Sequence, residues 1–593
     1  MTYLTLTNNF SLLFILLFLF NNLIIITLSR RYLTYRGVQI ISIIINILFL
    51  LSCLYYWKFY ILDSAQTIFC YKINSNNWSN INYEISFKIN SLSFLFILLV
   101  SIIGTATNFY ILNYFKFEER SEEFILLINW FIFSMIFLVI SNNLFTIIIG
   151  WELIGLTSFL LINFWRFKVS TLACSFKAFV FNKFSDIFLM IGFCILWNTY
   201  KTSNVDTLLT LINLTPSNNA SLYKAGICIL ISACVKSAQF IGHLWLPDSM
   251  EAPVPASSLI HSATLVSAGI YLLLKFQPLF IHTGLTNIIF FIGSFTACFG
   301  GLVAASQSDM KKLLAYSTIS HCGFIFASIT LNNFIVTIVY LYLHGLFKAV
   351  TFFCAGSIIK YNNTQDTRQM GMNKNQIVHI VMLSVAAINL GGLPFTFGYL
   401  YKFLFLSYLI ITPVNLVSYG FCLIGMLTSI AYVFKIIYYS CFDFRKGTYQ
   451  HLLGLLSISN NSIKELFKNY NFLKLIAFYI IYLFSAIFYC IVKYYILKNY
   501  IFFYYTNDFQ SSDYKFLNDL MVSNAHLISL YYILFFTAVC SLILISWRGI
   551  IFQENIGAII GIIIGIGSFY NFNRPFDCII FRSGFLDIFL HIL

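Results

Sequence analysis

Charged side chains are scarce in this 593-residue chain: Asp, Glu, Lys and Arg make up 9% of it, against 60% hydrophobic and 19% aromatic residues. A soluble domain carries about 25% charged residues, so the composition argues against a sizeable soluble domain. A bilayer span needs about 20 mostly apolar residues. The length admits many spans, and the composition therefore predicts a polytopic membrane protein.

Paired cysteines are missing as well. The 14 cysteines lie singly, without any Cys-x-x-Cys spacing, which argues against a disulfide scaffold, a zinc site and an iron–sulfur cluster. The chain also lacks a Gly-x-Gly-x-x-Gly pattern after a predicted strand, which nicotinamide or flavin binding would favour. We therefore expect no cofactor and no metal on this chain.

The basic residues do not form a cluster, although the formal net charge is +14. Nucleic-acid binding needs a basic patch on one face, so we expect no nucleic-acid partner. Lys and Arg in the loops of a membrane protein act as orientation signals and contact anionic lipids. Membrane lipids such as cardiolipin are the expected small partners.

Hydropathy predicts about sixteen spans in an all-α polytopic fold. The apolar run at 10–28 is too long for a signal peptide and is interpreted as the first span. The spans lie near 10–29, 38–57, 92–113, 124–143, 144–162, 173–198, 224–243, 256–275, 287–306, 313–331, 334–360, 376–412 (interrupted), 416–440, 471–495, 524–548 and 553–570. Longer polar loops are expected at 58–88, 199–223, 441–470 and 499–523.

Lys236 stands out because it lies inside an apolar stretch of membrane-helix length, from Gly226 to Gly242. A charge at the centre of a bilayer costs about 2.5–3.5 kcal/mol on insertion scales, so it marks a functional site by default. Three of the chain's eight prolines follow within nine residues, starting at Pro247. A charged helix that breaks at membrane depth indicates an ion path.

A second break recurs at Gly391-Gly392-Leu393-Pro394, shortly before Lys402. Two interrupted hydrophobic segments in two halves of a chain are typical of transporters built from inverted repeats. We expect N-terminal helices at 1–123, five-helix repeats at 124–275 and 287–440, and C-terminal helices at 441–593.

Further ionisable residues lie inside apolar runs: Glu152, His261, Lys348 and Lys402 join Lys236, and His344 shares a helix face with Lys348. We expect Glu152 and Lys236 to pair, because each charge would favour the charged form of the other. Lysines and histidines joined by water can relay protons.

Structural interpretations compete with this one. The Glu152–Lys236 pair could serve stability only, and His261 or His344 could be core histidines with backbone partners. Lys311 and Lys312 follow Asp309 at a helix start, which favours an interfacial position, and the sequence alone leaves His321 ambiguous.

Seven blocks between residues 87 and 406 carry a family resemblance. They are FKINSLSFLFILLVSIIGT (87–105), GWELIGLTSFLLINFW (150–165), VKSAQFIGHLWLPDSMEAPVPASSLIHSATLVSAGIYLL (235–273), SDMKKLLAYSTISHCGF (308–324), HGLFKAVTFFCAGSII (344–359), QDTRQMGM (365–372) and GGLPFTFGYLYKFLFL (391–406). Together they resemble subunit 5 of the mitochondrial NADH:ubiquinone oxidoreductases, respiratory complex I. Sister subunits 2 and 4 and the large subunit of Mrp-type antiporters share this fold, and the block at 150–165 points to subunit 5.

The resemblance implies roles for the candidate residues. The positions of Glu152 and Lys236 form a pair in that family, and those of Lys348 and Lys402 continue a hydrophilic axis, with the positions of His261 and His344 between them. Asp186 matches a supporting block, in which Lys183 replaces an arginine.

The chain also departs from the family pattern. Tyr340 stands where a second histidine is expected, Asn90 where an aspartate is usual, and Phe403 where an acidic residue commonly follows the lysine. The segment 570–593 is similar to the one that precedes a long lateral helix in the family. We expect this helix to be truncated here and supplied by a separate subunit.

The implied function is proton translocation by an antiporter-like membrane-arm subunit of complex I, with the flavin, iron–sulfur clusters and ubiquinone elsewhere in the assembly. Implied partners are other membrane-arm subunits, notably the antiporter-like subunit 4. The abundance of Phe, Ile, Asn, Tyr and Lys, which A/T-rich codons encode, indicates an organelle-encoded protein, and the expected location is the mitochondrial inner membrane. Two alternatives stay open: the large subunit of a multisubunit cation/proton antiporter, and a non-conducting scaffold of the membrane arm.

Overall fold

The computed structural model describes residues 35–442, with gaps at 58–59, 61–65, 74–82, 117, 119, 217–218, 332, 371–376, 394–395 and 412–414. All of these residues belong to the first of the two units into which the chain divides, Met1–Leu527. The expected spans near 10–29, 471–495, 524–548 and 553–570 lie outside the described residues, and so does the expected truncation of the lateral helix.

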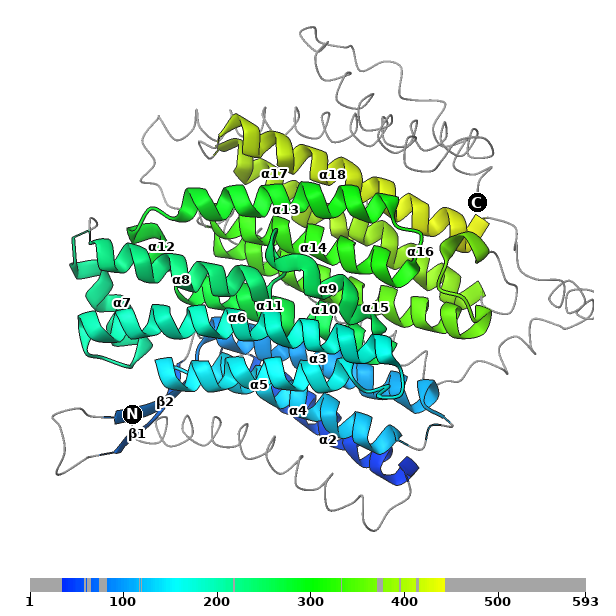
Figure 1. The fold of residues 1–593 in the computed structure, drawn as a ribbon, viewed down its shortest axis with the longest axis horizontal. Helices are drawn as coiled ribbons and strands as arrows, with labels where there is room; N and C mark the ends of the chain where they lie inside the picture. Colours follow the sequence, from blue (N-terminus) through cyan, green and yellow to red (C-terminus); the bar gives the residue numbers. More distant parts are fainter. Residues whose placement is uncertain are drawn as a thin grey trace, which may run out of the picture. The chain divides into compact units, whose positions relative to one another are not determined.

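The described chain is almost entirely helical, and its long helices lie side by side (Figure 1). Nine helices of the described part are long and apolar enough to cross a membrane. The principal helices are α2 Tyr35–Trp57, α3 Ser91–Tyr114, α4 Ser121–Ile140, α5 Leu144–Ile162, α6 Val169–Tyr200, α8 Ala220–Lys236, α10 Val254–Ser262, α11 Leu265–Lys275, α13 Thr286–Ser306, α14 Met310–Ile329, α15 Phe334–Asn362, α16 Ile377–Gly391, α17 Phe397–Ile411 and α18 Leu416–Ile437. The predicted all-α polytopic fold is confirmed.

Asparagine side chains begin several of these helices. Asn90, Asn143, Asn204, Asn219 and Asn333 each accept a hydrogen bond from a backbone N–H of the first turn. The first N–H groups of a helix have no partner within it, and an asparagine at the cap satisfies one of them at a value of about 1 kcal/mol. These caps fix where the apolar runs start to coil. Asn90 thus has a structural role at the position where the family usually has an aspartate.

A small hairpin is the exception to the helical fold. Strand β1 (Thr67–Ile73) pairs in antiparallel fashion with β2 (Tyr83–Ile89), where the sequence predicted a polar loop. Strands of seven residues are too short to register in a hydropathy window of about 19 residues. Similarly, the expected loop at 199–223 contains helix α7 (Val205–Leu214), whose Asp206 forms a salt bridge of 3.0 Å with Lys88 of the hairpin.

The first helix break comes earlier than predicted. Helix α8 ends at Lys236, not near residue 243. Ala238 and Ile241 then have positive φ angles of 53° and 75°, a backbone conformation that costs a non-glycine residue about 1–3 kcal/mol and concentrates at functional sites. Two short 3₁₀ helices, η2 (Gly242–Leu244) and η3 (Ser249–Glu251), flank α9 (Trp245–Asp248), which contains Pro247.

The span predicted at 256–275 is also interrupted. Ala263 and Thr264 separate α10 from α11, so the break lies two residues after His261. Gly269 of α11 packs so tightly on α8 that an added Cβ would lie 2.6 Å from the carbonyl oxygen of Ala233. This contact brings α11 against the last turn of α8, next to Lys236.

The interruption predicted near 391–394 is present, because α16 ends at Gly391 and α17 begins at Phe397. Pro394 itself lies outside the described residues. Residue 124, where the first predicted repeat starts, lies in the first turn of α4, and residue 287, where the second starts, lies in the first turn of α13, with α12 (Gln277–His282) linking α11 to α13. The inverted relation of the two repeats stays a prediction.

Candidate functional site: a series of buried lysines and histidines

Lys236 is completely buried at the end of α8. Its Nζ donates a hydrogen bond of 2.8 Å to the carbonyl oxygen of Trp151, lies 4.8 Å from the centre of the Trp151 ring, and approaches Oδ1 of Asp186 to 3.4 Å. Asp186 is buried too, with 2% of its side chain exposed. A buried ammonium group beside a buried carboxylate forms a charge pair withdrawn from solvent.

Glu152 acts on Lys236 electrostatically, but the two side chains do not form the direct ion pair, because Asp186 is the carboxylate next to Lys236. Oε1 of Glu152 lies 3.4 Å from Nζ of Lys183, which in turn lies 3.5 Å from Oδ2 of Asp186. Successive helix residues are rotated by about 100°. Because Trp151 faces the interior, Glu152 turns outward. The four charges form one chain in the order Glu152, Lys183, Asp186, Lys236, and the supporting residue Asp186 is the direct partner of Lys236.

Trp151 holds this cluster together. Its indole Nε1 donates to Oγ of Ser185 at 3.1 Å, and Ser185 donates to the carbonyl oxygen of Ser232 at 3.0 Å. One hydrogen-bonded chain thus connects α5, α6 and α8. The two neighbouring residues therefore contact different lysines: Trp151 contacts the buried Lys236, and Glu152 contacts the half-exposed Lys183.

His261 lies in the last turn of α10 and is buried. Its Nε2 shares a hydrogen bond of 3.2 Å with Oγ of Ser249, in η3, and its ring stacks on Phe352 of α15 at 5.5 Å. Its Nδ1 is buried without a hydrogen-bond partner in the described part of the chain.

His344 and Lys348 occupy one face of α15, as their spacing predicts. Lys348 donates to Oγ of Ser317 on α14, and Nε2 of His344 is a second buried nitrogen without a partner among the described residues. Both Lys348 and His261 are close enough to His344 to act on it electrostatically. These three residues lie close together, away from Lys236.

Lys402 ends the series. It is buried in α17, and its Nζ donates two hydrogen bonds of 2.6 Å, to the carbonyl oxygen of Gly391 and to Oγ of Ser429. One partner, Gly391, is the last residue of α16 before the helix break, and the other, Ser429, lies in α18. The unwound segment supplies a backbone carbonyl that an intact helix would have used internally.

The sequence did not single out His321 as a site residue. Its Nδ1 lies 3.1 Å from the Tyr340 hydroxyl and its Nε2 lies 2.9 Å from the Tyr432 hydroxyl. The ring centre is 5.2 Å from that of His344. His321 lies four residues after Ser317 and therefore on the same face of its helix, which was the signal that the sequence offered. Its hydrogen-bond partners are seen only in the structure.

The described contacts thus gather the predicted residues into two clusters. One holds Glu152, Asp186 and Lys236, and the other holds His261, His344, Lys348 and Lys402, with His321 added. Within the described residues, no direct contact joins Lys236 to the second cluster. The broken segment from Ser237 to Ala252 lies between Lys236 and the start of α10 in the chain.

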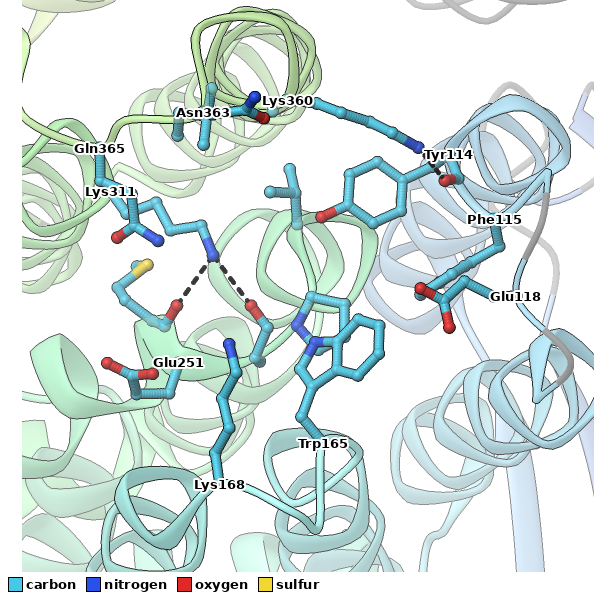
Figure 2. Close-up of a pocket in the computed structure, with 16 residues that line it drawn as sticks. Tyr114, Phe115, Glu118, Trp165, Lys168, Glu251, Lys311, Lys360, Asn363 and Gln365 are labelled. Carbon is cyan, nitrogen blue, oxygen red and sulfur yellow. Dashed lines mark hydrogen bonds between the residues drawn. The ribbon is translucent and has the colours of Figure 1, made fainter.

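A cavity of about 350 Å³ lies at the end of this broken segment (Figure 2). Lys311 reaches into its wall and donates hydrogen bonds of 3.1 Å to the carbonyl oxygens of Met250 and Ala252. The sequence favoured an interfacial Lys311. The structure places it at the start of α14 with 8% exposure, so it is an anchor for the broken segment. Lys168 and Glu251 also line the cavity.

Metal ligation finds no support in the residues that the structure describes, since these contain no group of three or more His, Cys, Asp or Glu side chains arranged to hold an ion. The expectation that the chain carries no cofactor stays a prediction.

The sequence and the fold are both similar to those of known membrane proteins. The family described as "NADH:quinone oxidoreductase/Mrp antiporter, TM" matches residues 141–430, which include every candidate residue named above. The archaeal membrane-bound sulfane sulfur reductase, a respiratory membrane complex, has a chain with the same fold, at a TM-score of 0.66 and 16% identity over 81% of this chain and 96% of that one.

Two relatives called NADH-ubiquinone oxidoreductase chain 5 are more similar in sequence. The one from Paramecium tetraurelia is 43% identical over 383 residues, which cover 63% of this chain and 67% of the relative. The one from Wickerhamomyces canadensis is 34% identical over 454 residues, which cover 74% of this chain and 68% of the relative. The chain belongs to the NADH-ubiquinone oxidoreductase chain 5 family of antiporter-like membrane proteins.

Proposed function

We propose that this chain is the proton-translocating, antiporter-like subunit of the membrane arm of NADH:ubiquinone oxidoreductase. The observation that carries the proposal is the row of fully or almost fully buried cations and imidazoles, Lys236, His261, His344, Lys348 and Lys402, within the family-matched region. Buried ionisable groups in a membrane protein are costly and mark ion or proton paths.

The first cluster acts as the control element. In a low-dielectric interior, a unit charge acts on another over several ångströms with an energy of some kcal/mol. A change of charge at Glu152 or Lys183 therefore alters how strongly Asp186 holds the proton of Lys236. Neutralising Asp186 leaves the Lys236 ammonium without its counter-charge and drives its proton away.

The proton released by Lys236 passes to the second cluster. Nδ1 of His261 and Nε2 of His344 have no protein partner among the described residues, so each can exchange a proton with water. Lys348 then takes the proton and Lys402 receives it beyond α15. The hydroxyl groups of Ser317 and Ser429 hold the two ammonium groups in place.

The redox chemistry takes place on other subunits in this proposal. NADH oxidation at a flavin, electron transfer through iron–sulfur clusters and reduction of ubiquinone supply the free energy, and this chain contributes the proton path. The partners of this chain are the other subunits of the membrane arm. We propose that the chain lies in the mitochondrial inner membrane and is encoded by the organelle genome.

The neighbouring antiporter-like subunit, of the subunit 4 type, is the proposed occupant of the α5–α6 face. The side chains of Glu152 and Lys183 are 41% and 43% exposed there, among apolar residues such as Phe184 and Ile187 that are about half exposed. Charges facing lipid are costly, whereas a polar protein neighbour would pair with them. We further propose that anionic lipids such as cardiolipin contact the chain.

The test has two stages. Detergent-solubilised mitochondrial membranes are separated on native gels, stained for NADH dehydrogenase and analysed by peptide mass spectrometry. Peptides of this chain are expected in the large active band. Peptides that run with other antiporter-type subunits, away from that activity, would instead show a multisubunit cation/proton antiporter.

The second stage compares Lys236→Met with the unchanged enzyme after reconstitution into vesicles. We expect normal assembly and a lower yield of pumped protons per NADH oxidised. An unchanged yield would show a non-conducting scaffold of the membrane arm.

A further inference from the structure

We infer that His321 is a proton-relay residue that connects the Lys348–His344 pair to Lys402, with Tyr340 and Tyr432 as the groups that orient its ring. This inference rests on the proposed function, because it names an additional member of the same path. The sequence left His321 undecided between a core histidine and a functional one.

The position of His321 is intermediate between the two lysines. It lies on α14 and is completely buried. The centre of its ring is 5.2 Å from that of His344 on one side and 6.5 Å from that of Tyr401, the residue before Lys402, on the other. Lys348 and Lys402 are both close enough to act on it electrostatically.

The two hydrogen bonds of His321 suit a relay. A neutral imidazole has one N–H donor and one acceptor nitrogen. The hydroxyl groups of Tyr340 and Tyr432 lie 3.1 and 2.9 Å from Nδ1 and Nε2, so one hydroxyl donates to the ring while the other accepts from it. Both nitrogens are therefore connected, and the ring spans the gap between α15 and α18.

The proton balance of the step is simple. The ammonium of Lys348 loses one proton and becomes an amine, and the proton passes through His344 to the tyrosine hydroxyl that donates to His321, whose own proton moves onto the accepting nitrogen of the ring. The opposite nitrogen of His321 gives its proton to the second tyrosine hydroxyl, which releases its own, and the amine of Lys402 becomes an ammonium. One proton moves, no electron moves, and His321 is left in its other tautomer until the hydroxyl protons of its tyrosine partners rearrange.

Tyr340 cannot fill this role by itself. A phenol has an ordinary pKa near 10, so it exchanges a proton only when a partner supplies one at the same moment. The imidazole is the side chain whose ordinary pKa lies closest to neutrality. The structure places that imidazole against the Tyr340 hydroxyl, so a histidine at position 340 would stand beside the ring of His321.

The test uses the assembled enzyme in vesicles and compares His321→Gln with the matched control His282→Gln. Glutamine keeps one donor and one acceptor but cannot relay a proton, so a structural His321 would tolerate it. His282, the last residue of α12, bonds the carbonyl oxygen of Thr215 and touches none of the path residues. We expect His321→Gln to slow proton uptake about tenfold or more, in line with the loss of a positioned acid–base group, and His282→Gln to leave uptake unchanged.

A rescue experiment separates relay from packing. Adding Tyr340→His to His321→Gln returns an imidazole to the position next to residue 321 and should restore most of the proton uptake. Should His321→Gln prevent assembly, Tyr432→Phe keeps the ring and removes one hydroxyl, and it should also slow uptake. Normal uptake in the assembled His321→Gln or Tyr432→Phe enzyme would overturn the inference.

Lys236→Met, measured in parallel, distinguishes failure of the His321 relay from failure of the proposed function. Loss in both Lys236→Met and His321→Gln supports the relay. Loss in Lys236→Met alone overturns the role of His321 and leaves the proposed function standing. No loss in Lys236→Met overturns the proposed function and, with it, the ordered route through His321.

Discussion

Lys236 and Asp186 form a salt bridge in which neither side chain reaches solvent: Nζ lies 3.4 Å from Oδ1, with 0% and 2% of the two side chains exposed. The pair joins the end of α8 to the middle of α6. It also explains why the helix can end at a lysine inside the bundle, because the carbonyl of Trp151 and the carboxylate of Asp186 together replace the water that the ammonium has lost.

Asp186→Asn should destabilise the chain more than the loss of an exposed salt bridge. Removing one partner of a buried pair costs about 3–5 kcal/mol, whereas an exposed pair contributes about 0–1 kcal/mol. Lys312 and Asp309, 3.6 Å apart and 47% and 38% exposed, form such a pair. The thermal inactivation midpoint of the purified enzyme is the measurement, with Lys312→Gln as the control. Equal midpoints for the two variants would contradict the assignment of Asp186 as the partner of Lys236.

The sequence predicted which ionisable residues are buried in the bundle better than it predicted their contacts. Hydropathy found the helices that cross the bundle, and the isolated charges in apolar runs identified Lys236, Lys348 and Lys402, because a charge in such a run is costly wherever it points. Pairing depends on the rotation of each helix. Glu152 was expected to pair with Lys236. Because it follows Trp151 by one residue, it is rotated by about 100° to the outer face of α5, where it forms an ion pair with Lys183.

Other features depended on contacts between distant segments, which periodicity does not encode. His321 acquires its role from hydroxyl groups on α15 and α18. Lys311 was expected at an interface because it follows Asp309 at a helix start, and its burial comes from carbonyl groups of the broken segment some 60 positions earlier.

Lys311→Met should loosen the broken segment. The substitution leaves the carbonyl oxygens of Met250 and Ala252 without their donor in a nearly buried place, and an unsatisfied buried polar group costs about 1–3 kcal/mol. Hydrogen exchange of peptides covering 245–254, followed by mass spectrometry on the intact enzyme, should show faster exchange. Lys360 is a suitable control, since it also donates to a carbonyl, that of Tyr114, but in an exposed position where water can replace it. Equally fast exchange in Lys360→Met would show that the anchor is not specific.

The α5–α6 face should lie against a neighbouring membrane-arm subunit. Phe184→Cys places a thiol on this face, where the phenylalanine is 49% exposed, and a short bifunctional maleimide should link it to the neighbour in the native enzyme. Ile44→Cys on α2, where the isoleucine is 50% exposed, serves as the control for reaction with any apolar surface. Mass spectrometry of the linked peptides identifies each product. The same product from both positions, or none from Phe184→Cys, would contradict the proposed interface.

Gly392→Ala should disturb Lys402 without touching its charge. Gly392 has a φ of +68°, and an added Cβ would lie 2.6 Å from Cδ of Lys402. The left-handed conformation costs a residue with a Cβ about 1–2 kcal/mol, and the clash must push the lysine stem away from the carbonyl of Gly391 and the hydroxyl of Ser429. We therefore expect slower proton uptake in vesicles together with a lower inactivation midpoint. Gly420→Ala in α18 is the control, because nothing lies within 4 Å of its added Cβ and alanine favours a helix over glycine by about 1 kcal/mol. If Gly392→Ala pumps as well as Gly420→Ala, the position of the Lys402 ammonium is not set by the helix break, and the path must end before α17.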